Sequence, residues 1–346
     1  MILLREIQEK DLDALERFAS VPGFINLPND PDLLREKIGK SIASFKDANP
    51  TGYSGKYYMF AAEDLESKRV LGTSMIAAQH GTDDSPHFYF EVGSEEKVSE
   101  TINTGFIHGT LKLKYDTNGP SEIGGLVLDP ASRNSEAKIG RQISFVRFLY
   151  LGLNKTRFKR KLIAELLPPL NKKGQSPLWE AIGRRFTNMD YWEADMLCQK
   201  NKEFIFSLFP SGKIYTTFFP AEARNAIGKV GKETEPVAHM LKKIGFKYKN
   251  QVDPFDGGPH LWANIDELLP VKKIGQYIYS PPMVSTENPE QGLLTKSGQK
   301  TGEFRAVAVE AIRSDGKLSL KESADAQVRS VLGIAPGDPV AFMPYY

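Results

Sequence analysis

The sequence predicts an α+β protein in which helices cover a mixed β-sheet, and three observations lead to this prediction. Residues 122–152 read as a strand, a polar loop and a helix. Two helical segments and a β-hairpin precede this unit, and short helices interspersed with strand-like runs follow it. Strands and helices therefore alternate irregularly, which favours a mixed sheet with a crossover at its centre.

The composition excludes several classes of protein. The chain has 346 residues, of which 40% are hydrophobic and 25% charged, and this balance is typical of a globular protein. A net charge of +2 gives no overall field to attract nucleic acid or an anionic membrane. No apolar run approaches membrane-spanning length and no signal peptide is visible, so we expect a cytoplasmic protein. The single cysteine, Cys198, excludes an internal disulfide.

The first part of the chain predicts a strand, two helices and then further strands. The helix over 10–20 places Leu12, Leu15 and Phe18 on one face. The polar turn at 63–68 separates two apolar runs, which is the pattern of a hairpin. The expected strands cover residues 2–7, 57–62, 69–78, 88–92 and 110–115, and the second helix covers 31–45.

The central unit contains a candidate anion site. The apolar run 123–128 predicts a buried strand, and a helix with Arg147 off its apolar stripe follows over 139–153. A helix N-terminus presents unpaired N–H groups and partial positive charge, which suits a phosphate or pyrophosphate. Arg133, Lys138 and Arg141 add charge there. The alternative is an ordinary strand-to-helix crossover.

The second half predicts shorter elements. Residues 176–186 and 234–246 share the order of cap, Pro, short helix, Gly and Phe, which raises the hypothesis of a weak internal duplication. Strands are expected at 160–167 and 261–265, and strands or buried segments at 204–209 and 215–219. A linker is expected at 281–301, followed by a small β-rich tail to residue 346. The expected domains are therefore 1–198, 199–280 and 281–346.

The order of elements in the first half resembles a GCN5-related N-acyltransferase. In that fold, backbone amides of the central strand and the following loop hold an acyl-CoA. The resemblance implies that the amides of Leu126, Val127 and Leu128 bind the pantetheine arm. It also implies that Arg133, Lys138, Gly140 and Arg141 hold the phosphates. The usual loop has glycine where this chain has Lys138, and the loop here is longer.

A narrower resemblance covers residues 2 to 310 in order. The chain is similar to the arginine N-succinyltransferase family, which succinylates the α-amine of arginine in arginine catabolism. Matching stretches include Leu126-Val-Leu-Asp-Pro130, Ser176-Pro-Leu-Trp179, Gly183-Arg-Arg-Phe186, Ala194-Asp-Met-Leu-Cys198 and Asp253-Pro-Phe-Asp-Gly-Gly-Pro259. The resemblance implies succinyl-CoA as a co-substrate, no permanently bound cofactor and direct attack in a ternary complex. It implies no nucleic-acid or membrane partner, and leaves assembly into a homo- or hetero-oligomer open.

The chain departs from this family at one position. The family places a histidine, regarded as the proton donor, directly after Ile-Gly-x-Val. Here the segment reads Ile227-Gly-Lys-Val-Gly231, and glycine cannot transfer a proton. The alternative function is therefore a catalytically silent or drifted relative that binds CoA or another ligand as a subunit.

The candidate catalytic and substrate-binding residues each have a structural alternative. Glu165, near the end of a strand, is the first candidate for the base or the electrostatic anchor of the amine. Its alternative role is an ion pair with Arg184 or Arg185. Asp253 and Asp256 are candidates for holding the arginine guanidinium. The alternative for both is that they only build a turn.

Weaker candidates come from the remaining reactive residues. His239 could replace the missing histidine as the acid, although a histidine on a helix surface is the simpler interpretation. Cys198, amid apolar neighbours, is read as a buried residue rather than a nucleophile. Tyr215 could protonate a thiolate or belong to the core, and His260 has no supporting motif. No metal-ligand spacing is present, so no metal is expected.

Overall fold

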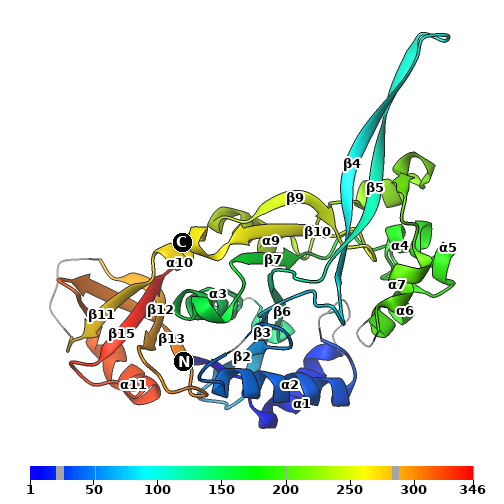
Figure 1. Ribbon diagram of the computed structural model, residues 1–346. Coiled ribbons are helices and arrows are strands. Elements are labelled where there is room, and N and C mark those ends of the chain that lie inside the picture. Colours follow the sequence, from blue (N-terminus) through cyan, green and yellow to red (C-terminus); the bar gives the residue numbers. More distant parts are fainter. Residues whose placement is uncertain (21–26, 51, 134, 199–200, 283–287, 346) are drawn as a thin grey trace. The chain divides into compact units, whose positions relative to one another are not determined.

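The computed structural model describes residues 1–20, 27–50, 52–133, 135–198, 201–282 and 288–345, which form two compact units (Figure 1). Unit 1 contains residues 1–78, 123–160 and 264–346, and unit 2 contains residues 79–122 and 161–263. This division differs from the three consecutive regions expected from the sequence. The reason is that each unit is assembled from segments that are distant along the chain.

Unit 1 is built on strands in the order β12-β15-β11-β14-β13-β1-β2-β3-β6, of which β6 contributes residues 123–128. The strands are β1 (Ile2–Glu6), β2 (Tyr57–Asp64), β3 (Val70–Ala77), β6 (Ser121–Leu128), β11 (Gly275–Tyr279), β12 (Glu290–Lys296), β13 (Arg305–Ser314), β14 (Lys317–Leu320) and β15 (Pro339–Pro344). The helices are α1 (Leu12–Ala19), α2 (Pro31–Lys46), α3 (Ile139–Leu153), α10 (Leu269–Lys272) and α11 (Glu322–Leu332), with 3-10 turns at Glu9–Asp11, Pro130–Ser132, Lys155–Arg157 and Ile265–Glu267.

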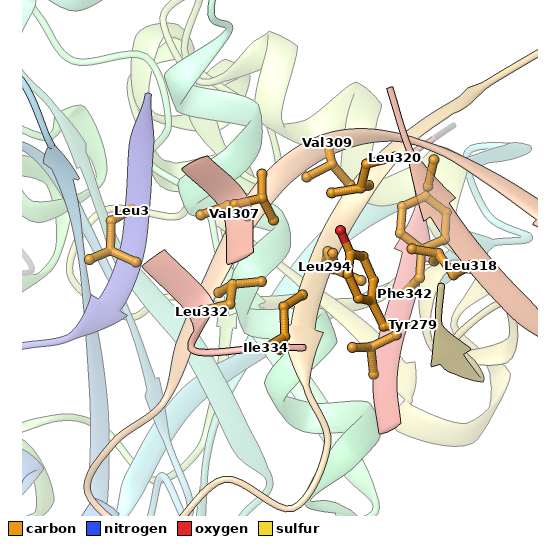
Figure 2. Close-up of a cluster of buried hydrophobic side chains, with 13 residues drawn as sticks. Leu3, Tyr279, Leu294, Val307, Val309, Leu318, Leu320, Leu332, Ile334 and Phe342 are labelled. Carbon is orange, nitrogen blue, oxygen red and sulfur yellow. The ribbon is translucent and has the colours of Figure 1, made fainter. Parts of the chain in front are cut away.

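The late strands of unit 1 are joined to its first strand through a shared apolar core. β13 pairs antiparallel with β1, placing Leu3 opposite Val307. Figure 2 shows the side chains that gather there, including Leu294, Leu332 and Phe342. The hydroxyl of Tyr279 within this cluster donates to Asp325. The predicted β-rich tail is therefore part of the core of unit 1, because burial of one face of β12–β15 requires β1 and α11.

Helix α3 is more deeply buried than its sequence pattern predicts. Arg147, expected off the apolar stripe, is only 2% exposed. Its guanidinium donates to the carbonyl of Ser144 (3.1 Å) and to that of Gly124 in β6 (3.3 Å). Burial lowers its pKa to about 9. The expectation for Arg147 was thus wrong, because a guanidinium can satisfy backbone carbonyls inside the fold and thereby join α3 to β6.

Unit 2 is built on strands in the order β7-β10-β9-β4-β5-β8, with the first two residues of β6 beside β7. The strands are β4 (His87–Ser99), β5 (Thr104–Asp116), β7 (Lys161–Glu165), β8 (Lys213–Tyr215), β9 (Lys247–Val252) and β10 (Pro259–Asn264). The helices are α4 (Pro177–Ala181), α5 (Gly183–Thr187), α6 (Tyr191–Cys198), α7 (Glu203–Leu208), α8 (Ala221–Ala226) and α9 (Glu235–Ile244), with a 3-10 turn at Thr216–Phe218.

Two features of unit 2 position the site. β7 is parallel to the start of β6, with Ser121 opposite Leu162 and Glu122 opposite Ile163. β4 and β5 form a long antiparallel ribbon that continues to Ser99 and Thr104, well past the predicted strands (Figure 1). The apolar pattern used for prediction ends where the ribbon becomes exposed, although its backbone ladder continues.

Other differences from the sequence-based expectations are local. Residues 203–208 form helix α7 rather than a strand, and Phe204, Ile205 and Phe209 are buried, in agreement with the alternative of a buried segment. The expected linker 281–301 contains strand β12, and its residues 283–287 lie outside the described part of the chain. The hypothesis of duplication gains no support, because helix α6 follows residues 176–186, whereas strand β9 follows residues 234–246. Among the described helices, none is long and apolar enough to cross a membrane.

Candidate active site

The strand-to-helix crossover in unit 1 places the predicted phosphate-binding residues at the start of α3. Lys138 is the N-cap residue and adopts a left-handed conformation, with φ 47° and ψ 48°. This region of backbone conformation favours glycine, which explains why glycine suits this position of the loop. Gly140 lies in the first turn, where an added Cβ would come 3.5 Å from Leu128, an ordinary contact. Lys138 therefore preserves the turn at some conformational cost.

The basic side chains of the crossover differ in how they are held. The guanidinium of Arg141 lies 4.3 Å from the centre of the Tyr345 ring and 5.8 Å from that of Phe145. Arg133 and Lys138 are exposed. Cation–π contacts orient a guanidinium without using its N–H donors. The start of α3 therefore has the oriented guanidinium of Arg141 and the exposed side chains of Arg133 and Lys138 beside the helix N-terminus.

The main finding in unit 2 is a group of imidazoles around one carboxylate. We call Glu122, Glu165, His80, His87 and His260 the imidazole–carboxylate cluster. Oε1 of Glu165 lies 3.6 Å from Nε2 of His80, 3.3 Å from Nε2 of His87 and 3.5 Å from Nε2 of His260. On its other side, Nδ1 of His80 lies 2.9 Å from Oε2 of Glu122.

Different elements bring the cluster together. Glu165 is the last residue of β7, His87 the first of β4, and His260 the second of β10. The N–H of Leu166 donates to the carbonyl of Pro259, which joins the end of β7 to the start of β10. The N–H of His80 donates to the carbonyl of Pro120 and holds His80 beside the start of β6. The cluster therefore results from non-local strand pairing.

Burial and neighbouring charges give the cluster members different protonation preferences. Burial lowers the pKa of His260 to about 3 and also lowers that of His87. Burial opposes a charge on His80 as well, but Glu122 and Glu165 outweigh it and raise its pKa. Burial would raise the pKa of Glu165, yet the surrounding imidazoles hold it well below its usual range. Glu165 is thus an ionised carboxylate, which is better suited to attract a cation than to accept a proton.

A second pair of carboxyls lies in the turn before β10. Oδ1 of Asp253 accepts from the N–H groups of Phe255 (2.7 Å) and Asp256 (3.1 Å), and Oδ1 of Asp256 accepts from Gly258 (2.7 Å). Burial raises the pKa of Asp253 to about 7 and that of Asp256 well above its usual value. Both residues therefore cap the turn. Asp253 also places an oxygen within 4.8 Å of Glu165 and His260.

Two of the sequence motifs, Ser176-Pro-Leu-Trp179 and Asp253-Pro-Phe-Asp-Gly-Gly-Pro259, support this turn. The ring of Trp179 stacks on that of Phe255 at 4.8 Å, and Ser176 caps α4 by accepting from the N–H of Trp179. Gly258 is required because an added Cβ would lie 2.1 Å from the carbonyl oxygen of Leu166. The motifs thus act together to hold the turn against the end of β7.

Position 231, where the family histidine is replaced, lies beside the residues that follow Glu165. The N–H of Gly231 donates to the carbonyl of Leu167 at 2.9 Å. An added Cβ would lie 2.8 Å from the carbonyl oxygen of Pro168, closer than real Cβ contacts. A side chain at this position therefore requires the backbone to shift.

The remaining candidates lie apart from Glu165 or have other partners. His239 is exposed on α9, and no contact among the described residues joins it to Glu165. Arg184, one alternative partner of Glu165, is bound instead to Glu180 at 2.7 Å. The hydroxyl of Tyr215 donates to Glu95. Burial raises the pKa of the Cys198 thiol to about 12, which agrees with the prediction that it is not a nucleophile.

Sequence reasoning missed His80 and His87 and gave little weight to His260. Their separation along the chain resembles no known motif, so spacing could not reveal them. One signal was available, because His260 directly follows the Phe-Asp-Gly-Gly-Pro turn in a chain with only five histidines.

Comparison with known proteins agrees with the fold and the motifs. Residues 2–269 match the family described as arginine N-succinyltransferase beta subunit. The arginine N-succinyltransferase of Yersinia enterocolitica is 34% identical over 343 residues, covering 98% of this chain and 96% of that protein. The arginine N-succinyltransferase of Escherichia coli O17:K52:H18 is 34% identical over 276 residues, which is 79% of each chain.

A solved structure gives the same result for the fold. Subunit AI of arginine/ornithine succinyltransferase from Pseudomonas aeruginosa superposes with a TM-score of 0.83 and 26% sequence identity. The match covers 99% of this chain and 98% of that one. The prediction of a mixed α+β acyltransferase-like fold is therefore confirmed. The chain belongs to the arginine N-succinyltransferase family.

Proposed function

We propose that the protein is a CoA-dependent N-acyltransferase that transfers a succinyl group from succinyl-CoA to the α-amine of arginine in the cytoplasm. Family membership supports the reaction class, and relatives named as the enzyme favour this function over a catalytically silent relative. The observation that carries the proposal is Glu165, an ionised carboxylate at the end of β7 whose side chain is 26% exposed. It offers a binding place for the protonated amine of the acceptor.

The residues at the start of α3 in unit 1 are suited to bind the acyl donor, succinyl-CoA. The amides of Leu126–Leu128 would bind the pantetheine arm, while Arg133, Lys138, Gly140 and Arg141 would hold the phosphates at the start of α3. The N-terminus of this helix attracts anions through its free N–H groups and its dipole. Arg141 is already oriented by the Tyr345 ring, which reduces the entropy lost on binding.

The carboxyl and imidazole side chains of unit 2 are suited to bind the acceptor, arginine. Glu165 would anchor the ammonium group, and Asp253, whose pKa burial raises to about 7, would offer its carboxyl to a guanidinium. Asp256 is assigned to the turn, because its Oδ1 accepts from Gly258 and its Oδ2 lies 3.5 Å from the Tyr191 hydroxyl. The amine must lose a proton before attack, and His80, which contacts Glu165, is the imidazole we assign to accept it.

We propose direct attack of the acceptor amine on the thioester in a ternary complex, a reaction that needs no protein nucleophile. The raised pKa of Cys198 removes the one thiol that could form a covalent intermediate. Positioning of amine and thioester supplies much of the acceleration in such a complex. The imidazole–carboxylate cluster also means that proton transfer does not depend on a side chain at position 231.

A thiol-release assay tests the proposed function. The protein is dialysed against a chelator, and release of CoA from succinyl-CoA is followed with arginine, ornithine, lysine or no acceptor. We expect release that depends on arginine, with N-succinylarginine identified by mass spectrometry. Failure of every acceptor to release thiol, with succinyl-CoA binding confirmed by calorimetry, would instead support the silent relative.

Arg141→Ala is expected to weaken CoA binding by about 10-fold, since a charge-assisted hydrogen bond to phosphate contributes roughly 1.5 kcal/mol. Calorimetry with CoA and with dephospho-CoA measures the loss. Lys155→Ala is the matched control, because Lys155 is an exposed cation of unit 1 paired with Asp266. Equal CoA affinity of wild type and Arg141→Ala would rule out this assignment.

A further inference from the structure

The imidazole–carboxylate cluster contains buried nitrogen atoms that lack partners. His87 is 1% exposed and His260 is fully buried. None of their four ring nitrogens makes a hydrogen bond of good geometry among the described residues, although Nε2 of His87 and Nε2 of His260 lie 3.3 and 3.5 Å from Oε1 of Glu165. Buried polar side chains are nearly always hydrogen-bonded or bound to an ion or water. Two such imidazoles beside one carboxylate therefore require an explanation.

The arrangement of His80 limits the explanations. Its Nδ1 faces Glu122 at 2.9 Å, so in the neutral ring the proton lies on Nδ1 and the lone pair lies on Nε2. Nε2 then lies 3.6 Å from Oε1 of Glu165, either as a donor in the protonated ring or with its lone pair on a cation held between the two atoms. A carboxylate on the far nitrogen of a ligating imidazole is also the usual support of a metal-bound histidine.

The two distances from Glu165 to the imidazoles suit a small transition-metal ion. One donor atom from each of His80, His87 and Glu165 lies within 4.8 Å of the other two. At zinc–ligand distances of about 2.0–2.1 Å, neighbouring ligand atoms of a tetrahedral site lie about 3.3–3.4 Å apart. The distances from Glu165 Oε1 to His87 and His80 are 3.3 and 3.6 Å. Imidazole with carboxylate is a donor set that suits zinc and its neighbours.

The charge of the site is also uncompensated by basic side chains. Among the described residues, no lysine or arginine lies within ion-pair distance of Glu165 or Asp253. Lys202, whose charge acts on the cluster, donates to the carbonyl of Pro86 at 3.3 Å. A divalent ion would supply the missing positive charge.

We infer that the imidazole–carboxylate cluster binds one divalent transition-metal ion, with Nε2 of His80, Nε2 of His87 and Oε1 of Glu165 as its ligands. Glu122 orients His80 through Nδ1, and His260 and Asp253 lie beside the same carboxylate. A fourth position remains for water, since His80 and Glu165 are the partly exposed members. An ion bound here occupies the carboxylate that the proposed function assigns to the amine. The occupied and empty clusters are therefore alternative states of the site.

Metal binding is tested directly on the full chain, independently of acyl transfer. Chelator-treated protein is titrated with Zn²⁺ by calorimetry, and bound zinc is counted by elemental analysis after gel filtration. We expect one ion per chain. Co²⁺ in its place should give the visible absorption of a site with nitrogen and oxygen ligands and low coordination number.

Variants decide whether the cluster is the site. His87→Gln and Glu165→Gln each remove a ligand and are expected to weaken zinc binding by at least about 100-fold, while Glu122→Gln should weaken it by about 10–100-fold. The matched control is the double variant His108→Gln/His239→Gln, because both histidines lie outside the cluster. Its zinc affinity should equal that of the wild type. If His87→Gln does not fold, as judged by circular dichroism, His80→Gln at the partly exposed ligand replaces it.

Two results would overturn the inference. One is the absence of stoichiometric zinc in the chelator-treated and reloaded wild type. The other is zinc binding of wild-type affinity in both His87→Gln and Glu165→Gln, which would place the ion outside the cluster. Because neither result involves thiol release, the metal site and the proposed acyl transfer can fail separately.

Discussion

Glu165→Gln is expected to lower kcat/KM for arginine by about 100-fold in metal-free protein. The substitution keeps the shape of the side chain but removes the charge that anchors the acceptor amine. Hydrogen bonds to charged groups contribute about 1.5–3 kcal/mol, and a fixed carboxylate also orients the amine for attack. Steady-state thiol release at saturating succinyl-CoA measures the effect, and KM for succinyl-CoA should not change.

The control for this prediction is the other candidate acid from the sequence. His239 is exposed on α9, so His239→Gln should leave kcat/KM within about 2-fold of wild type, as is usual for surface substitutions. A large decrease in kcat/KM for His239→Gln, together with near-normal kcat/KM for Glu165→Gln, would indicate that His239 rather than Glu165 acts in catalysis. Such a result would also contradict the assignment of the amine site to the cluster.

Arg5→Met is expected to destabilise the fold by about 3–5 kcal/mol. Arg5 in β1 is 5% exposed, and its guanidinium donates to both oxygens of Asp11 at 2.7 and 2.9 Å and to Glu63 at 2.5 Å. Loss of the guanidinium leaves the buried Asp11 without its cation and Glu63 with only the exposed Lys10 at 3.8 Å. An unpaired buried charge costs more than the pair itself contributes. Urea unfolding at neutral pH measures the difference.

A second variant tests whether burial of the ion pairs causes this loss. Arg35→Met, which breaks the exposed pair with Asp32, is the matched control and should cost less than about 1 kcal/mol. An equal loss in both variants would contradict the buried-network explanation.

The parts of the fold that were predicted correctly depend on local patterns. Three patterns of this kind depend only on residues that are close in sequence. They are the helical period of α1 and α3, the polar turn between β2 and β3, and the apolar run of β6. The same reasoning failed where tertiary contacts override the pattern. Segment 203–208 forms a helix, and the exposed part of the β4–β5 ribbon is held by its own ladder rather than by burial.

The candidate site was predicted only in part for a related reason. Glu165 was identified because it ends a recognisable strand, and the crossover residues were identified because they begin a helix. The partners of Glu165 were not. His87 and His260 reach it through the pairing of β4, β7, β9 and β10, and His80 reaches it through its backbone hydrogen bond to Pro120. No linear spacing encodes contacts between residues that lie so far from Glu165 along the chain.

The sequence by itself therefore determined the family of this protein, its mixed fold and the crossover at 122–152, because these follow from local periodicity and contiguous motifs. The tertiary structure alone decided that the glycine at position 231 is enclosed by backbone and that three separated histidines surround Glu165. The physical reason is that a buried carboxylate takes its charge state from neighbours in space. Those neighbours are supplied by strands that meet only when the sheet of unit 2 forms.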